Sequence, residues 1–385
     1  MPSQILHTLF GEDVIAEIYR RLGSRFGIVA DRALEKIRTD YRTAFALGCQ
    51  GPDIFYHSQG RRPVGLEYGT LLHRRGAGVF TAGLLKMGLP DPPPDEEDIR
   101  QGRREKGINA LGVYALGFMT HAVLDRRAHP YIVYKSGYVS PANPETLRYA
   151  RLHAFFERII DVLMLEKLRG EDAVSWDQEE ILAEICEKPP LGLKELLARA
   201  LVLAFPERAG KDEKLSRRID NTFADCADFY RRMAPRRTSL ASSGEEPPPL
   251  GILAYVYPEQ LPGDMDFLNL KKDPWYYPAG NGGEDRRSFP EIYAQAVADA
   301  ALSISPVIDR YLATGIFPIK EAAQAIGNEG LSIHDENGKP CAPTRADPLP
   351  LDRVLKEQEK LRLSQGLAGS GKLARGSGGS SSSAS

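Results

Sequence analysis

Residues 111–131 read LGVYALGFMTHAVLDRRAHPY, and their apolar residues recur three and four positions apart. This spacing predicts a helix over 107–128 that buries a broad apolar face. Its most apolar part ends at Leu124, is shorter than the ~20 residues that a bilayer span needs, and contains His121. We therefore interpret it as a core helix of a soluble protein. Pro130 is expected to bend the chain away, because the residue before a proline disfavours the α conformation.

The same helical period dominates the rest of the chain, whereas strand patterns are few. The sequence therefore predicts an all-α fold. We expect further helices over the ranges 12–22, 26–38, 75–87, 146–169, 178–186, 192–204, 212–233 and 289–313.

Clusters of proline, glycine and serine divide the chain into three expected parts. Residues 1–320 are expected to form the helical domain, in which 235–287 is too long for a simple connection and is interpreted as a long loop or a lid. Residues 321–365 would form a C-terminal extension. Residues 366–385 are rich in Gly and Ser without apolar periodicity, so we expect a disordered tail.

Composition excludes several classes of protein. Lys and Arg total 50 against 52 Asp and Glu, and the net charge of -2 creates no general field that would gather nucleic acid or anionic membrane. The four cysteines lie far apart, which indicates buried thiols rather than a zinc knuckle or a redox pair. No export signal and no transmembrane segment are evident, so we expect a cytoplasmic protein. The sequence does not predict the oligomeric state.

Histidine placement is the strongest functional indication in the sequence. Two of the seven histidines, His57 and His334, lie in polar, loop-like surroundings and are expected to be solvated. The other five lie at expected helix ends or on expected buried faces: His7, His73, His121, His129 and His153.

Two helices repeat one spacing of metal-binding residue types. His121 and Asp125 are four residues apart, which places them on one helix face about 6 Å apart along the axis. His129 continues that stripe. His153 and Glu157 repeat the spacing on the next predicted helix. Because an imidazole and a carboxylate one turn apart can reach one metal ion, two such helices packed face to face predict a metal site.

Buried carboxylates strengthen this interpretation. Asp125, Glu157 and Asp161 lie among apolar residues, where an unpaired carboxylate is strongly unfavourable unless a cation or an arginine compensates it. Asp161 would be either a ligand or a carboxylate that orients a ligand histidine. One such pair would be weak evidence, because single buried histidines are common in ordinary cores. A metal-free core, in which histidines and acids pair directly, stays open as the alternative.

Taken in order, these residues resemble the zinc-dependent phospholipase C family, whose fold is shared with the fungal single-strand nucleases. The matching motifs cover about residues 1–170, and weaker similarities follow at 274–278 and 288–289. The motifs are HTLFG with His7, GPDIF with Asp53, His73, GFMTH with His121, Asp125, HPY with His129, and His153 with Glu157.

The resemblance implies a multi-helix, phospholipase C-like or nuclease-like domain with two or three zinc ions. One ion would be held by Asp53, His73, His121 and Asp125, and a second by His129, His153 and Glu157. His7 would help to bind a third, with Asp125 bridging two ions, and Asp53 would be the catalytic carboxylate. The chain departs from the family in beginning with Met1, where secreted members have a tryptophan ligand, and in its shorter interval between Asp125 and His129.

The expected function is metal-dependent hydrolysis of phosphate esters by a metal-bound hydroxide, with two ions ~3.5–4 Å apart clamping the phosphoryl group. A phospholipid is a candidate substrate, and the near-neutral charge argues against nucleic acid. Two alternatives stay open. One is a single-strand nuclease-like phosphodiesterase, and the other is a non-catalytic, zinc-stabilised helical module that binds a partner through 235–287. Mixed nitrogen and oxygen ligands also tolerate other divalent ions.

Overall fold

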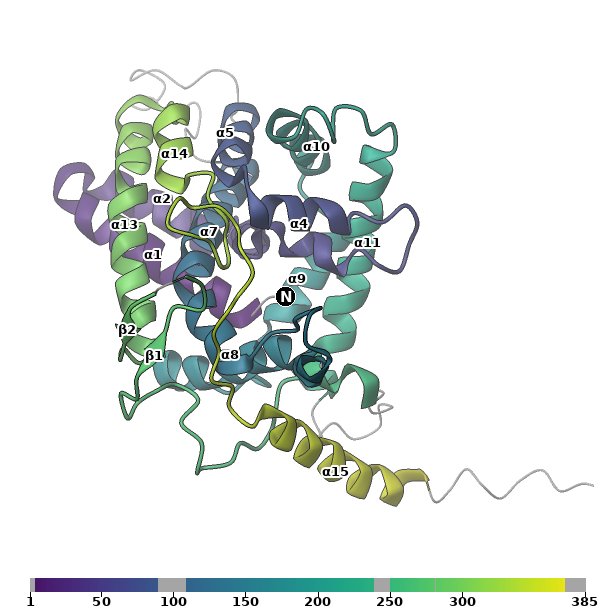
Figure 1. Cartoon of the computed structure of the whole chain (residues 1–385). Coiled ribbons are helices and arrows are strands. Elements are labelled where there is room, and N and C mark those ends of the chain that lie inside the picture. Colours follow the sequence, from purple (N-terminus) through teal and green to yellow (C-terminus); the bar gives the residue numbers. More distant parts are fainter. Residues whose placement is uncertain (1–3, 89–108, 239–249, 281, 371–385) are drawn as a thin grey trace, which may run out of the picture.

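The computed structural model describes residues 4–88, 109–238, 250–280 and 282–370 (Figure 1). Helices dominate these residues, and the two strands among them are short. The all-α fold class is therefore confirmed.

Most helices surround one long central helix, α7 (Ala110–Ser136) (Figure 1). The helices before it are α1 (Gln4–Phe26), α2 (Ile28–Arg38), α3 (Arg42–Cys49), the 3-10 helix η1 (Gly51–His57), α4 (Leu66–Arg74) and α5 (Ala77–Met87). Those after it are η2 (Pro144–Tyr149), α8 (Leu152–Arg169), α9 (Gln178–Glu187), α10 (Leu193–Ala204), α11 (Leu215–Met233), α12 (Pro235–Thr238), η3 (Leu250–Tyr255), α13 (Phe289–Thr314), α14 (Ile319–Ile326) and α15 (Leu351–Ser370). The strands β1 (Trp275–Tyr276) and β2 (Glu284–Asp285) pair antiparallel.

Helix α7 is longer than expected, because it continues through Pro130 to Ser136. The expectation that the helix ends at residue 128, before this proline, is wrong. Tyr131 is buried and packs its ring against Trp275 and Phe289, at centroid distances of 5.5 and 5.6 Å. Residues 132–134 are buried as well. Apolar burial of this extra turn offsets the hydrogen bond that proline cannot donate.

Helices α3 and α7 approach each other closely at two glycines. A Cβ atom on Gly117 would lie 2.6 Å from the carbonyl oxygen of Phe45, and one on Gly48 would lie 2.2 Å from that of Tyr114. Only residues without side chains permit this backbone contact. Its consequence is that the end of α3, at Cys49, lies against the His121 turn of α7.

Several helix boundaries differ from the expected ones. Helix α1 begins at Gln4 rather than near residue 12, and the range 146–169 divides into η2 and α8. The division occurs at Arg151, whose φ of 70° lies outside the helical region. The position of this division matches the pattern of burial, because η2 has no buried residue whereas α8 buries a continuous face from Leu152. Helices α3, α4, α14 and α15 lie where no helix was predicted.

The segment 235–287 contains α12, η3 and the β1–β2 hairpin, and residues 239–249 and 281 lie outside the described part. Tyr257 and Trp275 in this segment are buried, so its described parts pack onto the helices. Whether any of it moves as a lid stays a prediction.

The C-terminal part of the chain crosses the face of the molecule before α15 begins (Figure 1). The backbone N–H groups of Asp347 and Leu349 donate to the carbonyls of Tyr134 and Lys135 at the end of α7, at 3.0 and 2.8 Å. Helix α15 then continues to Ser370, so it includes the first residues of the expected tail. The rest of the tail, 371–385, lies outside the described residues.

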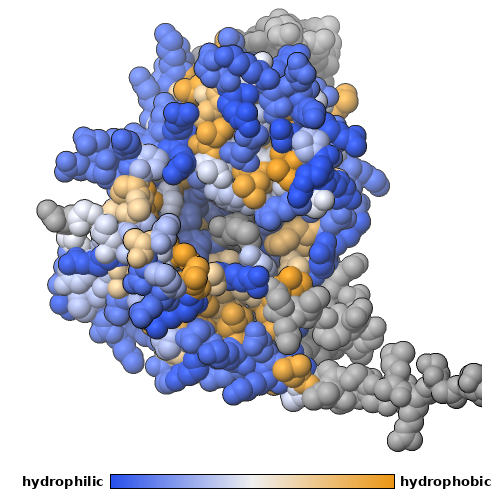
Figure 2. All heavy atoms as spheres, turned by 45° about the vertical axis from the view of Figure 1, so that its right-hand side comes forward, coloured by the Kyte–Doolittle hydropathy of each residue, from blue (hydrophilic) through white to orange (hydrophobic). Residues whose placement is uncertain are grey.

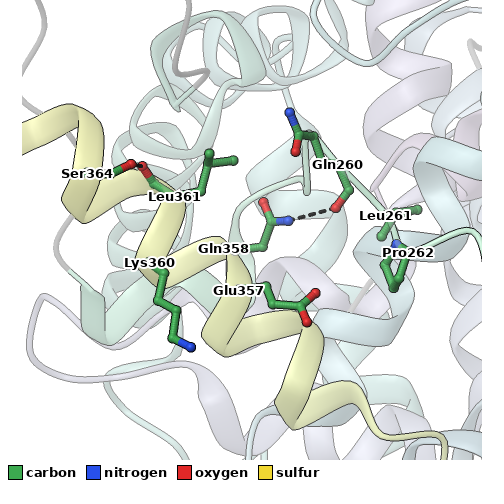
Figure 3. A pocket seen from close by; sticks show the side chains of 8 residues that line it. All are labelled: Gln260, Leu261, Pro262, Glu357, Gln358, Lys360, Leu361 and Ser364. Carbon is green, nitrogen blue, oxygen red and sulfur yellow. Dashed lines mark hydrogen bonds between the residues drawn. The ribbon is translucent and has the colours of Figure 1, made fainter.

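A cavity of about 500 Å³ separates α15 from the residues that follow η3 (Figure 3). On one side of it the Gln358 side chain donates to the carbonyl of Gln260, at 2.7 Å. None of the eight predicted site residues lines this cavity.

On the face that Figure 2 presents, hydrophobic residues gather near the middle and hydrophilic ones surround them. The helices of the described ranges are all too short or too polar to cross a bilayer.

Candidate metal centre

The predicted site residues come from five separate elements and converge around α7. His7 lies on α1, Asp53 on η1 and His73 on α4, whereas α7 and α8 carry the remaining residues, His121, Asp125, His129, His153 and Glu157. Their nitrogen and oxygen atoms form three groups, in each of which the ligand atoms lie within 4.8 Å of one another, and two of these groups share His121. These groups could hold metal ions.

The first group joins three elements around two carboxylates. His73 Nε2 lies 3.0 Å from Asp53 Oδ1 and 3.4 Å from Asp125 Oδ2. His121 Nε2 lies 3.2 Å from Asp125 Oδ2 and 3.9 Å from Asp53 Oδ2. Both rings therefore direct the same nitrogen toward the same pair of acids.

The second group lies between α7 and α8. His153 Nε2 is 3.1 Å and His129 Nε2 is 3.5 Å from a single oxygen, Glu157 Oε1. The His153 side chain is 29% exposed, compared with 4% for Glu157, so this group is open to solvent on the His153 side.

Asp125 connects the groups. Its Oδ2 faces His73 and His121, whereas its Oδ1 lies 3.3 Å from His7 Nε2 and 3.6 Å from His129 Nδ1. A carboxylate with each oxygen directed to a different set of histidines has the arrangement of a bridging ligand.

Backbone carbonyls fix a hydrogen on Nδ1 of three of the rings. Nδ1 of His121 lies 3.0 Å from the carbonyl oxygen of Cys49, and Nδ1 of His73 lies 2.8 Å from that of Gly69. Nδ1 of His129 lies 3.3 Å from that of Leu331. Because a carbonyl can only accept, each Nδ1 carries a hydrogen, so a lone pair on the ring can be presented only at Nε2.

The Nε2 atoms thus face carboxylate oxygens inside the protein. His121 Nε2, Asp53 Oδ1 and Asp125 Oδ2 are buried and have no hydrogen-bond partner among the described residues. Hydrogen-bonded ion pairs are usually about 2.7–2.9 Å long, whereas the shortest of these contacts are 3.0–3.5 Å. Ligand atoms around one tetrahedral zinc ion would lie roughly 3.3–3.6 Å apart, given bonds of about 2.0–2.2 Å. The donor set and its spacing therefore fit a divalent cation.

The charges of the metal-free cluster show what a cation would replace. Burial alone would lower the pKa of His73, but Asp53 and Asp125 raise it to about 10. Burial lowers the pKa of His7, with His121 adding to the effect. Burial likewise opposes ionisation of Asp125, yet His129 and His121 hold its pKa well below the usual value. The acids are thus ionised, and either protonated histidines or metal ions must compensate their charge.

Asp161 lies outside the three groups. Its carboxylate accepts the backbone N–H of Leu6 at 2.7 Å and that of Ile5 at 3.4 Å, in the first turn of α1. Asp161 therefore holds, by hydrogen bonds, the backbone of the two residues that precede His7. The sequence suggested a supporting role without indicating this partner.

Two further features were not foreseen. Tyr56 packs its ring 4.9 Å from that of His73, and burial together with the nearby acids raises its pKa. Its position three residues after Asp53, on the same short helix, was the available signal. His57, by contrast, is buried and stacks on Phe229 at 3.9 Å, so the expectation that it is solvated is wrong. Burial lowers the pKa of His57 to about 3.

No family model, no curated protein and no solved structure matches this chain. The resemblance to the zinc-dependent phospholipase C family therefore depends on the motifs and stays a prediction.

Proposed function

We propose that this protein is a zinc-dependent hydrolase of phosphate esters, similar in its centre to the zinc-dependent phospholipase C enzymes. One observation carries the proposal: histidine nitrogens and ionised carboxylates from five elements converge at ligand spacing in a buried cluster. Asp53, His73, His121 and Asp125 would hold one ion. His129, His153 and Glu157 would hold a second, and His7 would bind a third with Asp125 as the bridge.

Bound zinc supplies Lewis acidity toward a phosphoryl oxygen and lowers the pKa of water to about 7. The residues of the chain supply position and proton transfer. Asp53 is buried, and its neighbours His121 and His73 hold its pKa below the usual value despite the opposing effect of burial. An ionised carboxylate at this place can orient a water molecule and accept its proton. Asp53 is therefore the proposed general base.

Solvent access limits where a substrate can approach. The His73 and His153 side chains are 11% and 29% exposed, whereas those of His7 and His121 are 4% and 0% exposed. The phosphate group would therefore approach from the His73 and His153 side. The near-neutral charge favours a phospholipid or another small ester over a long nucleic acid strand.

A substrate panel tests the proposal. Protein saturated with zinc is assayed against phosphomonoesters, a phospholipid diester in mixed micelles, and single-stranded DNA. We expect hydrolysis of at least one class, and we expect Asp53→Asn to reduce kcat by about 10²–10⁴-fold. Asp264→Asn is the control, because Asp264 is an acid on the surface that pairs with Arg353 at 3.0 Å. A fully metallated protein that hydrolyses none of these substrates would overturn the proposal.

A further inference from the structure

A second buried cluster of charged groups lies behind the metal centre. It contains Arg158 and Asp161 of α8, Glu179 of α9 and Tyr257, which follows η3. These four side chains are at most 5% exposed. None of them belongs to the proposed ligand sets. The free-energy cost of removing their charges from water therefore suggests that they have another role.

The Tyr257 hydroxyl joins the other three groups. It accepts a hydrogen bond from Arg158 Nη1 at 2.7 Å, and it lies within hydrogen-bond distance of both Asp161, at 3.2 Å, and Glu179. The Arg158 guanidinium also lies over the Tyr257 ring, 4.7 Å from its centroid. The cluster thus ties α8, α9 and the segment after η3 to one hydroxyl.

One hydroxyl proton cannot serve two carboxylates. If Glu179 carries a proton, it donates to Tyr257, and Tyr257 then donates to Asp161. The environment supports this direction, because burial raises the pKa of Glu179 to about 7. Asp161 then remains ionised opposite Arg158, which lies 3.6 Å away, and the cluster has no net charge.

Asp161 connects this hydrogen-bonded cluster to the metal centre through the backbone of α1. Its two oxygens accept the N–H groups of Ile5 and Leu6, which have no partner within the first turn of a helix. No acidic residue of α1 lies in that first turn. His7 is the next residue, and its ring stacks on His121 at 4.2 Å. The backbone position that aims His7 at Asp125 is therefore held from α8.

We propose that the buried hydrogen-bond chain from Glu179 through Tyr257 to Asp161 positions His7 at the metal centre. Asp161, Tyr257 and Glu179 are positioning residues for this one ligand. The inference rests on the proposed function only in assuming that His7 is a metal ligand. These three residues belong to none of the proposed ligand sets, and their role is to support one ligand.

Tyr257→Phe is the most conservative test, because it removes only the hydroxyl. Zinc binding is measured by competition with a chromophoric chelator, and bound zinc is counted by elemental analysis after gel filtration. We expect one zinc ion to bind about 10–100-fold more weakly, as is usual when a group that supports a ligand is lost. The remaining ions should bind as in the unchanged protein, and His7→Ala should weaken the same ion.

Tyr293→Phe is the matched control. Tyr293 is also buried and also donates to α1, at 2.8 Å to Asp13, but on a later turn of the helix. It should leave zinc affinity unchanged. Glu179→Gln keeps a donor for Tyr257 and should retain full zinc binding, whereas Glu179→Ala should lose the same ion as Tyr257→Phe. This pair also decides the question if Tyr257→Phe does not fold, as judged by circular dichroism.

The possible outcomes separate the two proposals. Unchanged zinc affinity in a folded Tyr257→Phe protein, or an equal loss at every ion, would overturn the positioning role while leaving the metal centre intact. If His7→Ala binds zinc normally, His7 is not a ligand and the positioning role fails, whereas the other two ligand groups are still tested by His121→Ala and His153→Ala.

Discussion

At the scale of single residues, His121 shows how the centre is built. Its Nδ1 is committed to the carbonyl of Cys49, so its Nε2 is the nitrogen that faces Asp53 and Asp125. The ring is fully buried and cannot turn to water. A backbone group therefore fixes one side of the ring, and the nitrogen on the other side is placed where it can bind a cation.

Replacing this ring should remove metal. We expect His121→Ala to bind at least one zinc ion fewer per chain than the unchanged protein, as counted by elemental analysis. His334→Ala is the control, because His334 lies outside all three ligand groups and should leave the zinc content unchanged. Equal zinc content in both variants would exclude His121 as a ligand.

Glu179 should make stability depend on pH with a definite sign. Its folded pKa of about 7 lies above its ordinary value of 4.5, so folding favours the protonated form. The contribution is complete below the ordinary pKa and is lost as the pH rises through about 7, at about 1.4 kcal/mol per pH unit. Glutamine does not ionise. In zinc-saturated urea unfolding between pH 5.5 and 8, the stability of Glu179→Gln relative to the unchanged protein should therefore increase with pH. A difference that does not vary with pH would contradict a raised pKa.

At the scale of elements, the crossing of α3 and α7 determines where the histidines point. Gly48 and Gly117 allow the two backbones to touch, and this contact brings the carbonyl of Cys49 to the ring of His121. The nearby Gly51 has a φ of 55°, and a Cβ atom there would lie 2.3 Å from the same ring. The close approach that places the His121 ring therefore requires glycine at these positions.

Gly117→Ala should be costly for this reason. Its methyl group would meet backbone atoms of α3, which cannot move as a flexible side chain can, so we expect a loss of about 1–3 kcal/mol in the free energy of unfolding. Gly23→Ala is the control, because nothing lies within 4 Å of its added Cβ in the last turn of α1. It should gain about 0.5–1 kcal/mol. Urea unfolding of both variants measures these changes, and a Gly117→Ala protein as stable as the control would disprove the close crossing.

Periodicity and spacing were sufficient to predict part of this architecture. The four-residue intervals of His121 with Asp125 and of His153 with Glu157 are local, so one turn of helix determines them, and both pairs lie 3.1–3.2 Å apart. The carbonyl of Leu331, which orients His129, is 202 positions away in sequence. No local pattern indicates such a contact. The same is true of the bond from Leu6 to Asp161, across 155 positions.

The errors have physical causes as well. Pro130 was expected to end a helix because proline removes a donor, but tertiary burial of the following turn outweighs that loss. Helices α3 and α4 have only 8 and 9 residues, too few for a period to be recognised. His57 lies in a polar stretch of sequence, yet aromatic residues of α11 cover it in the fold.

At the scale of the whole molecule, the centre ties together elements far apart in the chain. Ligands from α1, η1, α4, α7 and α8 surround shared acids, so bound cations would act as links between five elements. Without them, Asp53 and Asp125 must rely on protonated histidines for compensation.

Metal removal should therefore destabilise the entire fold. A ligand at 100 times its Kd stabilises the folded state by about 2.7 kcal/mol for each site. We expect excess chelator to lower Tm by on the order of 5–10 °C. Calorimetry checks this value, and adding zinc back should restore Tm whereas adding magnesium should not. A Tm that chelation leaves unchanged would mean that no cation contributes to stability.

The central claim is that cations neutralise the buried acids around α7. Crystallographic anomalous scattering at the zinc absorption edge tests it most directly. We expect one peak among Asp53, His73, His121 and Asp125, and another among His129, His153 and Glu157. Density without anomalous signal at both places, with the histidines paired directly to the carboxylates, would contradict it.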